Sequence, residues 1–158
     1  MNVNREKYMR EAIRLAAENV KNNTGGPFGA VVVKDGKIIA AAANTVTSDK
    51  DPTAHAEINA IRLACQKLHT FDLQHCEIYA SCEPCPMCLS AIYWARIDKL
   101  YYAANHNHAS AAGFDDTFIY EELEKPEHER RISATTLLSE EGQEPFLAWS
   151  KSENKITY

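Results

Sequence analysis

Three cysteines fall within the stretch SCEPCPMC, residues 81–88, and prolines stand on both sides of Cys85. The chain has an odd number of cysteines, five, and their crowding is typical of metal or redox chemistry rather than of a disulfide framework. If a helix begins near Pro86, the sulfurs of Cys85 and Cys88 lie near its N-terminus. There the unpaired N–H groups and the helix dipole favour thiolates, which are good zinc ligands.

Two cysteines supply only half of a tetrahedral site, so further ligands must come from elsewhere. His55 and Glu57, in the stretch TAHAE, stand at the expected start of another helix. Side chains at i and i+2 point in different directions, so His55 can bind an ion at the helix end while Glu57 reaches past it. One histidine and two cysteines leave the fourth position open, as in catalytic zinc sites.

An open zinc site predicts a particular chemistry. Zinc lowers the pKa of a water molecule from about 15.7 toward about 7, so that hydroxide is available at neutral pH. Glu57 is expected to accept the proton, pass it to a ring nitrogen of a substrate and later protonate a departing amine. The pattern His-x-Glu followed by Pro-Cys-x-x-Cys is typical of zinc deaminases.

Each of these residues alone has a simpler interpretation. His55 alone is typical of a satisfied polar residue and Glu57 alone of a solvated helix charge. The cysteine pair alone is compatible with a redox motif or with half of a structural zinc knuckle. Cys82 could close the site as a fourth ligand, although the bend at Pro84 favours packing of its side chain instead. A binding or structural protein with a closed zinc site is therefore the rival from another class.

The order of the expected elements predicts the fold class. Residues 4–22 have the apolar spacing of a helix, and AVVVKDGKIIAA indicates two strands around Asp35-Gly36. A helix is then expected to open at Asp51-Pro52. The elements expected after it are the strand CEIYAS, the helix LSAIYWARI, the strand KLYYAA, the polar loop NHNHASAAGFDD, a strand over 132–138 and a helix over 143–154.

Alternating strands and helices of this kind predict an α/β fold, namely a three-layer α/β/α sandwich with a mixed sheet. No repeat, low-complexity segment or linker divides the 158 residues, so a single domain over 1–158 is expected. The net charge of −5 argues against a protein that grips a phosphate backbone. The sequence lacks an apolar run of about 18 residues and a signal-peptide core, so no membrane span and a cytoplasmic location are expected.

With these residues identified, the chain resembles the cytidine/deoxycytidylate deaminase superfamily. The similarity runs through GGPFGAVVVKDG, DPTAHAEINAI and SCEPCPMCLSAIYWARI. Those stretches are shared by bacterial guanine deaminases and tRNA-adenosine deaminases, so they imply the reaction type and not the substrate. YYAANHNHASAAGFDDTFIYEEL and the tail EPFLAWSKSENKITY resemble bacterial guanine deaminases, and the resemblance then covers almost the whole chain.

This resemblance implies a zinc-dependent hydrolysis of guanine to xanthine and ammonia, with one Zn²⁺ per subunit. It implies that His55, Cys85 and Cys88 bind the metal and that Glu57 shuttles protons. The positions for which it implies contacts with the purine base are Phe28, Asn44, Ala56, Trp94, Asp116 and Tyr158.

The resemblance also implies a homodimer that exchanges C-terminal segments, here about residues 143–158. In that family the residue similar to Tyr158 enters the active site of the partner subunit. Phe146, Trp149 and Tyr158 are too apolar for a solvated chain end, which agrees with this interpretation.

The chemistry of guanine agrees with an acidic contact. Guanine presents N1–H and its exocyclic amine as donors, which suit an ionised carboxylate, whereas adenine offers an unprotonated N1. Asp115 and Asp116 could instead cap the next helix, and which of the two contacts the base stays open. The alternative functions are a tRNA-adenosine or cytosine-type deaminase, against which the acidic composition argues, and a deaminase of a related aminated heterocycle such as an s-triazine.

Overall fold

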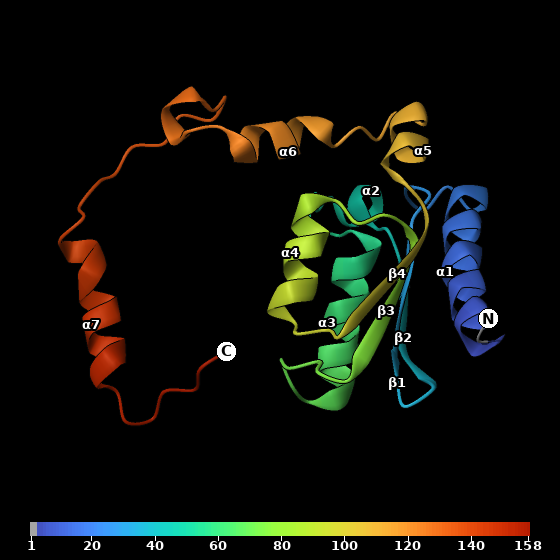
Figure 1. Ribbon diagram of the computed structural model, residues 1–158, viewed down its shortest axis with the longest axis horizontal. Coiled ribbons are helices and arrows are strands. Elements are labelled where there is room, and N and C mark those ends of the chain that lie inside the picture. Colours follow the sequence, from blue (N-terminus) through green and yellow to red (C-terminus); the bar gives the residue numbers. More distant parts are fainter. Residues whose placement is uncertain (1–2) are drawn as a thin grey trace. The chain divides into compact units, whose positions relative to one another are not determined.

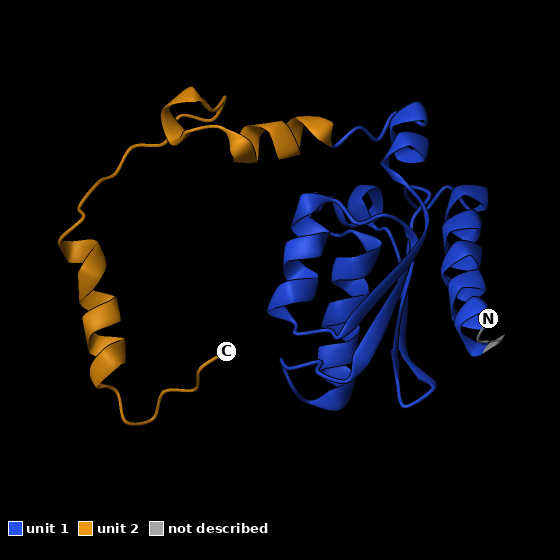
Figure 2. Ribbon diagram, viewed as in Figure 1, with its two compact units in different colours: residues 1–116 blue, residues 117–158 orange. Residues whose placement is uncertain are grey.

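The computed structural model describes residues 3–158 of the protein. The chain divides into two compact units, residues 1–116 and 117–158, which Figure 2 distinguishes by colour. The larger unit contains a four-stranded sheet, and the smaller unit is made of helices and connecting segments. The expectation of one deaminase domain over 1–158 stays a prediction.

The sheet of the larger unit has the strand order β2-β1-β3-β4. Strand β1 pairs antiparallel with both β2 and β3, whereas β3 and β4 are parallel, so the sheet is mixed as predicted. Helix α1 (Val3–Lys21) packs on one face, and α3 (Ala56–Leu68) and α4 (Pro86–Trp94) cover the other (Figure 1). The strands are β1 (Gly29–Lys34), β2 (Lys37–Ala43), β3 (Cys76–Cys82) and β4 (Lys99–Ala104).

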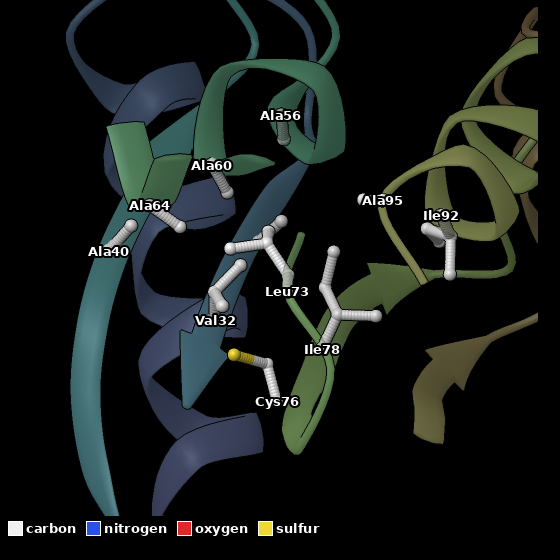
Figure 3. Packing of buried hydrophobic residues seen from close by; sticks show 11 residues of the cluster. Val32, Ala40, Ala56, Ala60, Ala64, Leu73, Cys76, Ile78, Ile92 and Ala95 are labelled. Carbon is white, nitrogen blue, oxygen red and sulfur yellow. The ribbon is translucent and has the colours of Figure 1, made fainter. Parts of the chain in front are cut away.

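The central strand β1 shows why the sheet is covered on both faces. Its side chains alternate, with Val31 and Val33 packed among residues of α1 and Val32 packed on the α3 side. Strand β3 repeats the alternation, because Ile78 joins Val32 while Tyr79 joins the cluster under α1. Figure 3 shows the α3 side of this core. Burial of side chains of this size stabilises the fold by about 1.5–3 kcal/mol each.

The strand directions bring four loops together beyond one end of the strands, which we call the sheet edge. Because β1 is antiparallel to its neighbours, its first residue lies beside the last residues of β2 and β3, as the pairings of Gly29 with Ala43 and of Ala30 with Ala80 show. Strand β4 is parallel to β3 and ends at the same edge. In open α/β sheets, ligands bind in the crevice outside such strand ends.

Two expectations for this unit are wrong in detail. The helix expected from Asp51-Pro52 begins only at Ala56, because the Asp51 carboxylate accepts hydrogen bonds from the backbone N–H (2.8 Å) and hydroxyl (2.7 Å) of Thr53 and forms a turn. A short helix, α2 (Val46–Asp49), precedes that turn. The expected polar loop contains α5 (His106–Ala111), whose first turn is closed by a capping box.

The smaller unit contains α6 (Thr117–Glu124) and α7 (Glu144–Lys151), with short 3-10 turns at Glu127–Glu129 and Glu141–Gln143. Helix α7 lies within the expected range 143–154, but the strand expected over 132–138 is wrong, because these residues are irregular and exposed. None of residues 117–158, all of which the structure describes, is buried. In the described part of the chain, no helix is both long and apolar enough to cross a membrane.

Candidate active site

A cavity of about 600 Å³ opens at the sheet edge where the four loops meet. Its walls come from the chain before β1, after β2, after β3 and after β4, and from the N-terminal ends of α3 and α4. The side chains in its lining that can carry chemistry include Asn44, His55, Glu57, Glu83, Cys85, His106 and Asp116.

Two helix N-termini bring the three predicted metal ligands together. His55 is the N-cap of α3 and Cys85 the N-cap of α4, while Cys88 lies in the first turn of α4, after Pro86. The ligand atoms of the three residues all lie within 4.8 Å of one another. The Nδ1 atom of His55 lies 3.5 Å from Sγ of Cys85 and 3.4 Å from Sγ of Cys88.

These separations fit a tetrahedral zinc ion. Zn–N and Zn–S bonds of about 2.1 and 2.3 Å at a tetrahedral angle place the nitrogen and the sulfur about 3.6 Å apart. Hydrogen bonds from Cys88 and His55, which outweigh the effect of burial, lower the pKa of Cys85 to about 4, so this thiol ionises readily. Soft thiolate and imidazole donors suit zinc, so the residues present fit the metal.

Cys82 lies apart from this group. Its side chain is 7% exposed, and its thiol lies 3.7 Å from the backbone carbonyl oxygen of Asn105. Burial raises the pKa of Cys82, which keeps the thiol neutral. Among the residues that the structure describes, the clustered ligand atoms are those of His55, Cys85 and Cys88 alone.

Glu57 stands in the first turn of α3 and lines the cavity, although its side chain is only 6% exposed. Burial, the largest influence, raises the pKa of this carboxyl above its ordinary value. Proton transfer is most efficient when the pKa of the catalytic group lies near the working pH, and a raised pKa moves a carboxyl group in that direction. The burial of Glu57 in the cavity wall and its raised pKa agree with the predicted role as a proton shuttle, which stays a prediction.

Asn44 is held in one orientation. Its Oδ1 atom accepts hydrogen bonds from the backbone N–H groups of Val46 (3.2 Å) and Gly26 (3.4 Å). The backbone carbonyl of Asn44 accepts a bond of 2.8 Å from the buried side chain of Asn19, and a Cβ atom at Gly25 would overlap that carbonyl. With Oδ1 engaged, Asn44 has its Nδ2 donors to offer to a ligand.

Asp116 lines the cavity together with Asp115, and its contact with a histidine was not predicted. The Nδ1 atom of His106 lies 3.2 Å from Oδ1 of Asp116, and the Nε2 atom of His106 lies 3.4 Å from Oε1 of Glu83. His106 and Glu83 line the cavity too. Sequence reasoning missed both residues because no local pattern links them; the ends of β3 and β4 bring them together.

The remaining predicted contacts fall in different places. Phe28 lines the cavity and packs edge-to-face on Phe114, a residue that was not predicted, with ring centroids 5.0 Å apart. Ala56 is fully buried in α3, whereas Trp94, at the end of α4, is 68% exposed, and the described lining includes neither. Tyr158 belongs to the smaller unit and is exposed.

Comparisons with known proteins agree with this geometry. The family model of the cytidine and deoxycytidylate deaminase zinc-binding region matches residues 2–104. That range contains His55, Glu57, Cys85 and Cys88, whereas His106 and Asp116 lie beyond it.

Relatives match this chain over different lengths. It is 53% identical to guanine deaminase from Bacillus subtilis, over 99% of this chain and all of that one. The crystal structure of guanine deaminase from that organism has a TM-score of 0.95 at 52% identity and covers 100% of this chain and 99% of its own. A tRNA-specific adenosine deaminase from Aquifex aeolicus is 43% identical over 63% of this chain and 66% of its own length. The chain therefore belongs to the cytidine and deoxycytidylate deaminase family.

Proposed function

We propose that this protein is a guanine deaminase, which converts guanine and water into xanthine and ammonia. The observation that carries the proposal is one cavity lined by His55 and Cys85 of a His/Cys/Cys group, by Glu57 and by an acidic side chain, Asp116. The full-length similarity to a guanine deaminase supports the same substrate, because tRNA-specific relatives match a shorter part of the chain.

The ligands His55, Cys85 and Cys88 would hold Zn²⁺, one ion per subunit. When bound, zinc supplies a Lewis acid that makes water acidic enough to react at neutral pH. The protein's part is to hold the three donors at the ends of two helices, where His55 and Cys85 line the cavity.

Glu57 moves the protons of the reaction. Water adds to C2 of guanine, and Glu57 takes one proton from it and delivers that proton to N3. Glu57 then carries the second proton from the new hydroxyl group to the amine, the bond between C2 and the amine breaks, and ammonia leaves. Xanthine remains, with a carbonyl at C2 and a proton on N3.

Asp116 and Asn44 select and orient the base. Asp116 accepts hydrogen bonds from the N1–H edge of guanine, while the Nδ2 group of Asn44 donates to an acceptor on the purine. Phe28, braced by Phe114, offers an aromatic face to the ring. A half-buried acceptor at this position rejects adenine, whose N1 carries no proton, because the carboxylate would be left without a partner.

The smaller unit supports an assembly with a second copy. Its apolar side chains, among them Phe146, Trp149 and Tyr158, are 73%, 46% and 71% exposed. We propose a homodimer in which residues 143–158 are exchanged, so that Tyr158, and on the larger unit Trp94, complete the partner's purine site. A cytoplasmic location stays a prediction.

The test is to incubate the zinc-loaded protein with guanine and to follow its ultraviolet absorbance, with xanthine and ammonia measured separately. We expect stoichiometric xanthine and ammonia, and no inosine in a tRNA anticodon stem-loop that contains adenosine. If a protein with full zinc occupancy left guanine unchanged, the proposal would be wrong. Inosine in the stem-loop would favour the tRNA-adenosine alternative instead.

A further inference from the structure

We propose that His106 is a positioning residue: it holds the Asp116 carboxylate in the orientation that accepts hydrogen bonds from the purine, and Glu83 in turn fixes His106. We call the contacts that join Glu83, His106 and Asp116 the tether. The identity of the base rests on the proposed function, whereas the tether itself rests on the contacts of these three side chains. None of the three belongs to the predicted metal ligands or to the proton shuttle.

Both carboxylate oxygens of Glu83 contact His106. One carboxylate oxygen, Oε1, lies 3.4 Å from the ring Nε2, and the other, Oε2, accepts a hydrogen bond of 3.3 Å from the backbone N–H of His106. Glu83 is itself anchored at the sheet edge, since its backbone N–H donates to the carbonyl of Ala104 at 2.9 Å. The ring of His106 is thereby fixed relative to the end of β4.

The other side of the ring contacts the carboxylate that faces the base. Nδ1 of His106 lies 3.2 Å from Oδ1 of Asp116, so Oδ2 remains to accept a hydrogen bond from a ligand. The side chains of His106 and Glu83 are each 29% exposed and that of Asp116 is 19% exposed. Partial burial shields these contacts from solvent, so they hold a geometry better than exposed ion pairs do.

Asp116 needs such a tether because its own segment contributes no residue to the buried core. Residues 105–116 lie outside the matched family region, and the structure shows none of them buried. Gly113, three positions before Asp116, has a positive φ of 91° and a side-chain position open to solvent. A carboxylate on such a segment must be fixed by its neighbours to select a base with precision.

The experiment uses the zinc-loaded full chain and a double-mutant cycle. We expect His106→Ala to lower kcat/KM for guanine by about tenfold or more, the effect typical of a lost hydrogen bond to a charged group. In an Asp116→Asn background the same His106→Ala change should have almost no further effect, because the residue acts through Asp116. Equal losses in both backgrounds would overturn the proposal.

A conservative variant and a matched control sharpen the cycle. The amide nitrogen of asparagine stands as many bonds from the backbone as Nδ1 of histidine, so His106→Asn should restore most of the kcat/KM. His75 forms a comparable contact, 3.5 Å from Asp98, away from the cavity, and His75→Ala should leave the activity unchanged. If His106→Asn were as impaired as His106→Ala, a donor toward Asp116 would not be its role.

A readout without activity separates this inference from the proposed function. Crystal structures of the zinc-loaded wild type, His106→Asn and His106→Ala should show the Asp116 carboxylate in one place in the first two and displaced or disordered in the third. If the wild type failed to convert guanine, the proposed function would be wrong, and these structures would still decide the tether. An unmoved Asp116 in His106→Ala would refute it.

Discussion

Residues up to Ala104 and residues after it differ in burial and in what they share with relatives. Of the residues whose burial the structure describes, all the buried ones lie between Tyr8 and Ala95, and the family model ends at residue 104. The predicted metal ligands and Glu57 belong to this first region, whereas His106, Asp116 and Tyr158 belong to the second. The difference teaches that the residues predicted to carry the reaction stand in and beside the buried core, whereas those of the second region that are predicted to contact the base lie in segments without a buried residue.

The sharpest test of the first region is Glu57→Gln. We expect a folded, zinc-loaded protein whose kcat for guanine falls by about 10² to 10⁴, because the amide cannot carry protons. Zinc content and circular dichroism serve as controls beside steady-state kinetics. Unchanged activity in a metal-loaded variant would favour the rival interpretation, a closed zinc site in a binding or structural protein.

The second region is tested most severely by deleting residues 145–158. We expect the remaining chain to stay folded and to bind zinc, but to lose dimerisation and about tenfold or more of its activity, as removal of aromatic anchors does. Light scattering reports the mass and kinetics the activity. A truncated protein that remained dimeric and fully active would exclude the exchanged segment.

Asp116→Asn tests whether the second region chooses the base. The amide presents a donor where guanine also has donors, so kcat/KM for guanine should fall by about 10- to 100-fold, mainly through a higher KM, with zinc retained. The adjacent Asp115→Asn is the matched control and should have a smaller effect, because the contact with His106 belongs to Asp116. A larger loss in Asp115→Asn would reverse the assignment.

The smallest effect is expected for Cys82→Ala. The thiol is buried at the end of β3 but lies outside the ligand group, so its loss should lower the free energy of unfolding by about 1 kcal/mol and leave zinc content and activity nearly unchanged. Denaturant unfolding and metal analysis measure the two quantities. Loss of zinc would make Cys82 a fourth ligand.

The elements that sequence predicted well are those whose side chains repeat with a clear period. The helix expected over 4–22 corresponds to α1, the hairpin around Asp35-Gly36 to β1 and β2, and the helix near Pro86 to α4. Helix α5 was missed because its capping box is made by Asn105 and His108 rather than by the usual serine or threonine with glutamate. The segment 132–138, expected to be a strand, has apolar residues, but no strand among the described residues 3–158 pairs with it.

The site divides in the same way. The meeting of His55, Cys85 and Cys88 beside Glu57 could be predicted because zinc chemistry needs these residue types at fixed distances from two helix starts, while their roles stay predictions. The contact of Glu83 with His106 could not, since these residues are 23 positions apart and meet only because β3 and β4 are parallel neighbours. Contacts of that kind follow from the topology of a sheet, which a local pattern does not encode.

Zinc-edge X-ray absorption of the loaded protein tests the central claim most directly, because it counts the donors around the metal. We predict two sulfur donors and one histidine nitrogen, with a further light donor that exchanges with solvent, and the same spectrum for Cys82→Ala. Three sulfur donors, or four donors all supplied by the protein, would describe a closed site and contradict the account.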